Sequence, residues 1–301
     1  MTLGVTTGVA SGLTLPVTLA VLFGALLHAS WNALIKSAAD KSLDTALIHV
    51  MGCVVGIPML ALAGLPPIEA VPFAMVSLVI HVGYYIALAG AYKHGDLGLT
   101  YPIMRGLAPM LVAMGSGLVI GEVLSFMAWL GVAGISCGVL LVGLNRAGFG
   151  LPGHRAALAF ALTNAVIIAM YTVVDGLGVR AATQHGGNAV QYVALLFLVD
   201  GIPYFLIVMS QRSAGQRAQA WQYMRGRWPL ALLGTLASLG SYGIALWAMT
   251  RAPVAAVAAL REVSVLFAAF LGVIVLKEKF GLQRAAGTIL IISSVAALRL
   301  A

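Results

Sequence analysis

The chain has 301 residues, of which 61% are hydrophobic and only 9% are charged, with a mean hydropathy of +1.02. Soluble domains carry about 25% charged residues, so this composition excludes an ordinary soluble protein and predicts an integral membrane protein. The formal net charge of +8 does not indicate nucleic-acid binding, because the charges lie in short loops between apolar segments, where they report orientation. Cys53 and Cys137 fall inside apolar segments and offer neither a disulfide framework nor metal-site spacing.

Ten segments approach the ~20 residues that cross a bilayer as a helix. In chain order they cover 17–37, 45–63, 72–93, 97–120, 124–144, 155–177, 189–210, 229–250, 254–276 and 282–300. Four prolines are expected at or near helix starts, where a missing N–H is harmless, and four inside segments, which they should kink. The first set is Pro16, Pro72, Pro229 and Pro253, and the second is Pro58, Pro102, Pro109 and Pro203.

The segments divide into two similar halves at a longer, Gly-rich link, residues 145–154. The matched positions are Tyr84 and Tyr242, Arg105 and Arg261, and Glu122 and Glu278. An odd number of helices per half gives the two halves opposite orientations, as in many secondary transporters. The predicted fold is therefore all-α and integral to the membrane, with ten transmembrane helices. They are arranged as two inverted five-helix repeats, residues 1–146 and 147–301, around a central cavity.

The 17 lysines and arginines are distributed unevenly between the two sides of the membrane. Two of them lie inside apolar segments, and Arg180, Arg251 and Arg299 lie on one side. The other twelve lie on the opposite side, in alternate loops. Positive charge marks the cytoplasmic side, so both termini are expected outside, in the periplasm, with the protein in the inner (plasma) membrane. The basic stretch 211–228 is expected to be an interfacial loop on the cytoplasmic surface.

Polar residues inside the segments recur at steps of three and four, which places most of them on one face of each helix. Charged and polar faces are costly in lipid, so they should line a shared cavity. A lone Tyr or Trp is also typical of an interfacial anchor and a lone His of a packing residue, so the prediction depends on their convergence. The candidate substrate-binding residues are His28, Trp31, Asn32, His81, Tyr84, Tyr85, Tyr101, Arg105, Asn164, Tyr171, Tyr242, Trp247, Arg261 and Glu262.

The pattern of motifs resembles the drug/metabolite transporter superfamily, and within it the EamA-type exporters. The resemblance is carried by the five-plus-five arrangement, by Trp31-Asn32 with Lys36, and by Gly121-Glu122 and Lys277-Glu278 at the ends of the fourth and ninth segments. It covers nearly the whole chain. It implies a basket in which helices 1, 3, 4, 6, 8 and 9 surround the cavity and helices 5 and 10 lie at the edge. It also implies alternating access and, in one branch, export of aromatic and other amino acids.

One departure from the superfamily concerns coupling. The small four-helix relatives use a glutamate in their first helix for proton-coupled export of cations, whereas here no acid precedes Asp40. The resemblance therefore does not extend to proton-driven export of lipophilic cations. If transport is coupled to protons, His28 and His81 are the candidate carriers.

The residue types favour a zwitterionic amino acid as the substrate. Arg105 and Arg261 offer forked donors to a carboxylate, and are expected near the cytoplasmic and the outer mouth respectively. The aromatic residues offer flat surfaces for an apolar side chain, and Glu262 or Asn32 could receive the ammonium. The prediction is an amino-acid exporter. Alternatives are export of another small amphipathic metabolite or drug, and a structural role in which each arginine binds backbone carbonyls or a neighbouring acid.

Other function classes find little support. The sequence has no Ser-x-x-Lys nucleophile in context, no His-Glu-x-x-His, no Gly-rich phosphate loop and no carboxylate pair at catalytic spacing. Glu122 and Glu278 are interpreted as solvated caps at helix ends. We therefore predict a protein that is not an enzyme and that takes no cofactor, metal or nucleic acid. A channel or receptor stays open as an alternative. The expected partners are a small-molecule substrate and the lipid bilayer, and a monomer is compatible with the sequence.

Overall fold

The computed structural model describes residues 13–95, 97–144, 154–276 and 281–301, and within them it contains helices and no strand. The helices are α1 (Leu15–Lys36), α2 (Lys41–Ala63), α3 (Val71–His94), α4 (Leu97–Val119), α5 (Phe126–Gly143), α6 (His154–Gln184), α7 (Ala189–Ser210), α8 (Ala214–Met249), α9 (Val254–Arg261), α10 (Ser264–Leu276) and α11 (Leu282–Leu300), with the 3-10 turn η1 (Ile68–Ala70) before α3. Among these described residues, nine segments are long and apolar enough to cross a membrane. The chain is an all-α, multi-pass membrane protein, as predicted.

Each predicted segment corresponds to a helix, with two differences. The ninth segment is broken between α9 and α10, where Glu262 N–H and Val263 N–H bond the carbonyls three residues earlier, at 3.0 and 3.2 Å. Such a 3-10 stretch inside a helical segment is tighter than the α-helix on either side. The predicted basic loop 211–228 is wrong from Ala214 onward, because α8 begins there and Pro229 lies inside it.

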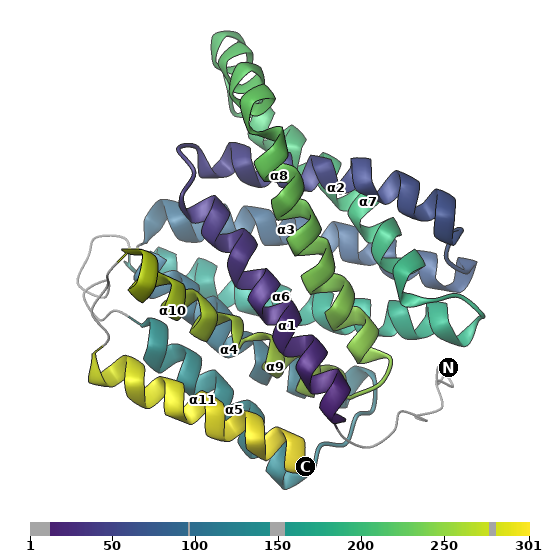
Figure 1. Cartoon of the computed structure of the whole chain (residues 1–301), viewed down its shortest axis with the longest axis vertical. Coiled ribbons are helices and arrows are strands. Elements are labelled where there is room, and N and C mark those ends of the chain that lie inside the picture. Colours follow the sequence, from purple (N-terminus) through teal and green to yellow (C-terminus); the bar gives the residue numbers. More distant parts are fainter. Residues whose placement is uncertain (1–12, 96, 145–153, 277–280) are drawn as a thin grey trace.

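The early start of α8 has a local cause in the sequence. The hydroxyl oxygen of Ser213 accepts from Gln216 N–H, while the Gln216 side chain accepts from Ser213 N–H at 2.9 Å, which makes a capping box. Figure 1 shows this amino-terminal part of α8 projecting from the bundle. The link 145–153, Lys277, Glu278 and Lys279 lie outside the described residues.

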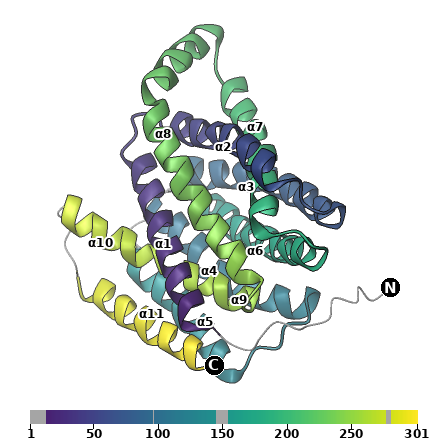
Figure 2. The ribbon, with the colours of Figure 1, turned by 45° about the vertical axis from the view of Figure 1, so that its right-hand side comes forward.

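The helices pack in pairs that position the cavity. The most extensive contacts join α5 with α11, α2 with α7, α3 with α6, α1 with α8 and α4 with α6. Both views show α1 and α8 side by side, and α5 and α11 together at the edge of the bundle (Figures 1 and 2). The α5–α11 contact uses small residues, because a Cβ on Gly138 would lie 3.0 Å from Gly287 O. Small residues at this contact let the two backbones approach closely.

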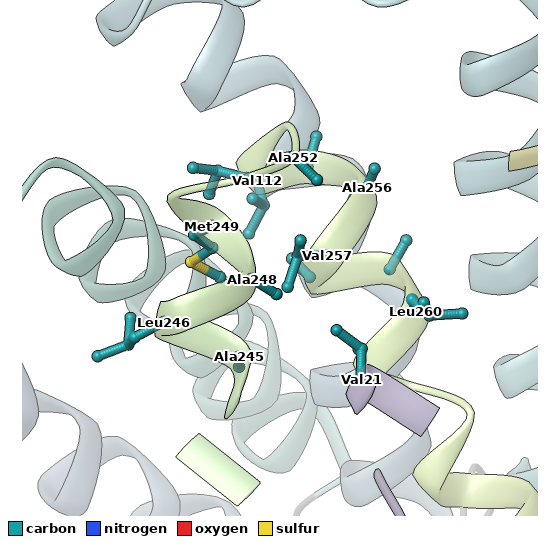
Figure 3. Packing of buried hydrophobic residues seen from close by; sticks show 14 of the residues in the cluster. Val21, Val112, Ala245, Leu246, Ala248, Met249, Ala252, Ala256, Val257 and Leu260 are labelled. Atoms are coloured by element: carbon teal, nitrogen blue, oxygen red, sulfur yellow. The ribbon is translucent and has the colours of Figure 1, made fainter. Parts of the chain in front are cut away.

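The bundle has two different ends. At the α1–α2 end, the connection between α1 and α2 meets the connection between α7 and α8, through an ion pair from Arg212 to Asp40. At the α8–α9 end, the connection after α4 meets the amino terminus of α9, through a hydrogen bond from Val254 N–H to Glu122. Buried apolar residues fill the α8–α9 end, and Figure 3 shows Val21, Val112 and the turn from α8 into α9 packed together. That packing leaves the space for a cavity in the other half.

Candidate functional site

A cavity of about 230 Å³ lies between α1, α2, α3, α4, α6, α7, α8 and α9. On most helices its residues come from the half nearer the α1–α2 end or from the middle, whereas on the long α8 they lie past the middle, at Ser238, Ser241 and Tyr242. Twelve of the fourteen predicted residues line it. They are His28, Trp31, Asn32, His81, Tyr84, Tyr85, Tyr101, Arg105, Asn164, Tyr171, Tyr242 and Arg261. The convergence expected from helical spacing is therefore present in the structure.

Two predicted residues do not line this cavity. Trp247 lies near the α8–α9 end, where its ring is 4.8 Å from the Arg251 guanidinium carbon. Glu262 lies behind the cavity wall, in a small adjoining space that Arg105 and Arg261 also line. Its carboxylate faces Arg105, with Oε2 2.9 Å from Nε. Glu262 is thus occupied by an arginine in this conformation, and the prediction that it faces a substrate ammonium is wrong for this state.

The second predicted receptor for an ammonium, Asn32, is also partly engaged. Its Nδ2 donates to the carbonyl oxygen of His28 at 2.8 Å, one turn earlier in α1. The His28 ring contacts the Trp31 ring edge-on, with centroids 5.3 Å apart. These contacts give α1 an ordered polar surface toward the cavity.

Arg105 and Arg261 line the same cavity, and their places toward the cytoplasmic and the outer mouth stay a prediction. They come together because α4 and α9 pack against each other. The contact of Arg105 Nε with Glu262 is an ion pair without hydrogen-bond alignment, and Arg105 Nη2 is buried without a partner among the described residues. The Arg261 guanidinium carbon lies 5.1 Å from the centre of the Tyr242 ring. Arg105 therefore pairs with an acid, as the structural alternative expected, and still keeps a free donor.

Aromatic rings form a continuous wall of the cavity. The His81 ring stacks on Tyr171 with centroids 4.4 Å apart, and Tyr84 contacts Tyr171 at 6.1 Å and Tyr85 at 5.4 Å. Asn164 Nδ2 donates to the backbone oxygen of Tyr84 at 3.0 Å and ties α6 to α3. Such a wall offers flat apolar surface to a ligand, with polar atoms at the ring edges.

Tyr242 is held in place by a buried carboxylate. Asp175 in α6 is fully buried, and it accepts hydrogen bonds from the hydroxyls of Tyr242 and Tyr192, the latter at 3.1 Å. Both Asp175 oxygens are thus used inside the protein. Asp175 fixes the ring on which Arg261 rests, and we assign it a positioning role.

Sequence reasoning missed two ionisable residues of the cavity, His49 in α2 and Asp200 in α7. The Tyr85 hydroxyl donates to Asp200 Oδ2 at 2.7 Å, and His49 Nε2 lies 4.0 Å from the same oxygen. The signal was present, because an ionisable residue inside an apolar segment indicates a functional site by default. Helices 2 and 7 were left out because each carries few polar residues and so lacks a polar face. The cavity is therefore lined by eight helices, two more than predicted.

Five buried polar atoms of cavity-lining residues have no hydrogen-bond partner within the described part of the chain. Arg105 Nε, Arg105 Nη2 and Trp31 Nε1 are donors, while Asn164 Oδ1 and Asp200 Oδ1 are acceptors. Leaving such a group unpaired costs about 1–3 kcal/mol, so native proteins normally satisfy it with protein, water or ligand. Donors and acceptors around one cavity suit a ligand that carries both kinds of group.

The α8–α9 end is closed by a buried ion pair. Arg180 Nη2 lies 2.6 Å from Glu122 Oε1, and Arg180 Nε donates to Met249 O at 2.8 Å. Glu122 Oε1 also accepts from Val254 N–H at 2.9 Å, which places its charge at the amino terminus of α9. The prediction that Glu122 is a solvated cap is wrong, because its carboxylate joins three elements of the closed end.

The α1–α2 end carries more exposed charge pairs. Arg212 Nη2 lies 2.9 Å from Asp40 Oδ2, and Arg227 Nε donates to Asp44 at 2.9 Å. Burial by itself would raise the pKa of Asp40. The hydrogen bonds from Leu43 N–H, from the Ser42 hydroxyl and from Arg212 outweigh burial and hold that pKa below its ordinary value. Asp40 is thus charged across the physiological range and keeps its pairing with Arg212.

Comparison with known proteins supports the transporter interpretation. Residues 155–300, which hold most of α6 and continue into α11, match the model of the EamA-like transporter family. A solved structure titled only "Crystal structure of protein" superposes with a TM-score of 0.72, over 95% of this chain and 96% of that chain, at 19% identity. At that identity the likeness shows a shared fold alone. No curated protein matches. The second half of the chain thus carries an EamA-like domain, which points to a membrane transporter rather than to an enzyme.

Proposed function

We propose that this protein is a secondary transporter that exports amino acids with apolar or aromatic side chains across the inner membrane by alternating access. The observation that carries the proposal is the free, buried Nη2 of Arg105 beside a wall of aromatic rings, in one cavity of a membrane bundle. The family match of residues 155–300 supports transport as the activity.

The cavity chemistry supports a carboxylate ligand with a flat or apolar body. An arginine with free donors binds a carboxylate through charge-assisted hydrogen bonds, and Arg261 adds a second positive charge. The Tyr84, Tyr85 and Tyr171 rings offer surface for the rest of the ligand. A cavity of about 230 Å³ is smaller than the roughly 300–1,000 Å³ pockets of drug-sized ligands. An amino acid or another small amphipathic metabolite therefore fits this state better than a drug.

Alternating access needs two states related by the symmetry of the fold. The contact of α3 with α6 has a counterpart in that of α8 with α1, and the α2–α7 and α5–α11 contacts each join equivalent helices. This pattern supports two inverted repeats, residues 1–146 and 147–301. In the described conformation the cavity lies toward the α1–α2 end and the other end is packed. With basic loops inside, this is a cytoplasm-facing state, and both termini are periplasmic.

A counterflow screen tests the function. The purified protein is reconstituted in proteoliposomes preloaded with each of the twenty amino acids, and uptake of labelled phenylalanine is measured. We expect saturable exchange with phenylalanine and with other apolar amino acids. Uptake that does not depend on the internal amino acid, or flux that never saturates, would indicate a channel. Absence of exchange with all twenty would contradict the proposed substrate class and favour another metabolite.

A further inference from the structure

The cavity has a second charged region, separate from the two arginines. Asp200 and His49 come from α7 and α2, which pack along each other, and Tyr85 comes from α3, which also contacts α7. The arginines come from α4 and α9, which contact each other. Among the described residues, His49 is the one basic side chain at ion-pair distance from Asp200. No arginine or lysine of the described part therefore neutralises this carboxylate.

The hydrogen bonds around Asp200 leave acceptors without donors. His49 Nδ1 lies 2.7 Å from the carbonyl oxygen of Thr45, which can only accept, so Nδ1 carries the proton in the neutral ring. His49 Nε2 then presents a lone pair 4.0 Å from Asp200 Oδ2. Asp200 Oδ1 is buried and has no partner among the described residues. Asp200 Oδ1 and His49 Nε2 are thus two acceptors that can receive hydrogen bonds from a ligand.

The group that fits is a compact cation with several N–H donors. An ammonium has three donors and no acceptor, so it can bond Asp200 Oδ1 and His49 Nε2 together. Tyr85, whose hydroxyl bonds the same carboxylate, also lines the cavity, and its ring can add cation–π attraction. We propose that Asp200, His49 and Tyr85 form the ammonium-binding pole of the cavity, opposite in charge to the Arg105–Arg261 pole. This inference rests on the proposed function and adds the residue that selects for a zwitterion.

The close approach of α2 and α7 at this pole depends on Gly201. A Cβ at Gly201 would lie 2.2 Å from the backbone oxygen of His49 and 2.6 Å from Cys53 Sγ. Glycine at that position lets α7 touch α2, and so places Asp200 beside His49. The residue next to Asp200 in the sequence is thus part of the same arrangement.

The test measures binding of three related probes to the purified full-length protein by calorimetry. Phenylalanine carries both charges, phenethylamine lacks the carboxylate, and 3-phenylpropionate lacks the ammonium. For Asp200→Asn we expect weaker binding of phenylalanine and phenethylamine, by about one to two decades, the value of a charge-assisted hydrogen bond. Binding of 3-phenylpropionate should be unchanged. Asp40→Asn is the matched control, because it removes an acid outside the cavity and should leave all three affinities unchanged.

A second variant keeps the test decisive if Asp200→Asn does not fold. His49→Phe retains a ring and removes the Nε2 acceptor, so it should also weaken phenethylamine and spare 3-phenylpropionate. Equal losses for all three probes, no loss for phenethylamine, or no binding of phenethylamine to the unmodified protein would each overturn the proposal. So would intact phenethylamine binding combined with loss of the response to a pH or sodium gradient, which would assign Asp200 to a coupling ion.

The outcome is separable from that of the proposed function. Phenethylamine binding that depends on Asp200 supports the ammonium pole even if no amino acid exchanges in proteoliposomes. Amino-acid exchange that survives in Asp200→Asn with unchanged affinity keeps the proposed function and removes the pole.

Discussion

Arg105 of α4 and Glu262, at the break between α9 and α10, form an ion pair inside the membrane bundle. Arg105 Nε lies 2.9 Å from Glu262 Oε2, and the two side chains are 10% and 6% exposed. A buried pair gives little net stability, but removal of one partner leaves an uncompensated charge and typically costs about 3–5 kcal/mol. The pair joins the first half of the chain to the second at the cavity wall. Any change of state that separates α4 from α9 must therefore supply another partner for Arg105, and a substrate carboxylate can fill that role.

The first prediction follows from the free Nη2 of Arg105. In Arg105→Lys the positive charge stays beside Glu262, whereas the forked donor is lost. A charged hydrogen bond is worth roughly 1.5–3 kcal/mol, so transport of phenylalanine should fall about ten-fold or more. The measurement is flux per folded transporter in proteoliposomes, with Arg261→Lys made in parallel. Normal flux per molecule in both variants, with less folded protein, would show that the arginines are structural.

The second prediction concerns pH and the Asp40–Arg212 pair at the α1–α2 end. The pKa of Asp40 is below its ordinary value in the folded protein, so its charged form contributes stability above about pH 3.9, the unfolded value. That contribution is lost as pH falls through the lower, folded pKa. Asp40→Asn keeps a good helix cap and removes the charge. We expect its melting temperature to be lower than wild type at neutral pH, with a gap that closes only in strongly acidic solution. A difference in melting temperature that appears or disappears near neutral pH would contradict the assignment of this stability to the Asp40–Arg212 pair.

The ten segments could be predicted from sequence because a long apolar run is the strongest local signal that a chain carries. Their ends agree with the helices to within a few residues where the polar boundary is sharp, as for α7. The start of α8 was missed because residues 214–228 are polar, and only the Ser213–Gln216 capping box indicated a helix there. The break at Glu262 was missed because no proline or glycine marks it, and Arg261, Glu262 and Ser264 were interpreted as the polar face of one continuous helix.

Residues that line the cavity could be predicted where several polar residues share one face of a helix. Trp247 was a wrong inclusion, and it lies off the face that carries Tyr242. Asp200 and His49 were omitted because each stands nearly alone in its helix, so that only the packing of α2 on α7 brings them together. The pairing of Arg105 with Glu262 likewise depends on the contact between α4 and α9, which no local pattern specifies.

The third prediction tests the close approach of α2 and α7. Gly201→Ala places a methyl group against the backbone of His49, and overpacking of this kind typically costs about 1–3 kcal/mol. We expect a lower melting temperature together with weaker phenylalanine binding, because Asp200 and His49 move apart. Gly226→Ala is the matched control, since a Cβ there meets nothing within 4 Å and the residue lies inside α8. Removing a helical glycine should stabilise that variant by about 0.5–1 kcal/mol. Equal behaviour of the two variants would argue against a special role for the α2–α7 contact.

The last prediction concerns the closed end of the bundle. Glu122 pairs with Arg180 and accepts from the first N–H of α9. Glu122→Gln keeps the size of the side chain but should weaken these contacts, which hold the α8–α9 end closed. We expect a larger share of molecules open at the α8–α9 end. The readout is labelling of a cysteine introduced as Val257→Cys, since Val257 is fully buried there, in a background with Cys53→Ser and Cys137→Ser. A membrane-impermeant maleimide added from outside the cell should label this cysteine faster in Glu122→Gln than in the parent. Asp44→Asn, which weakens the pair with Arg227 at the opposite end, should not accelerate labelling. Equal labelling rates in Glu122→Gln and its parent would show that apolar packing alone holds this end shut.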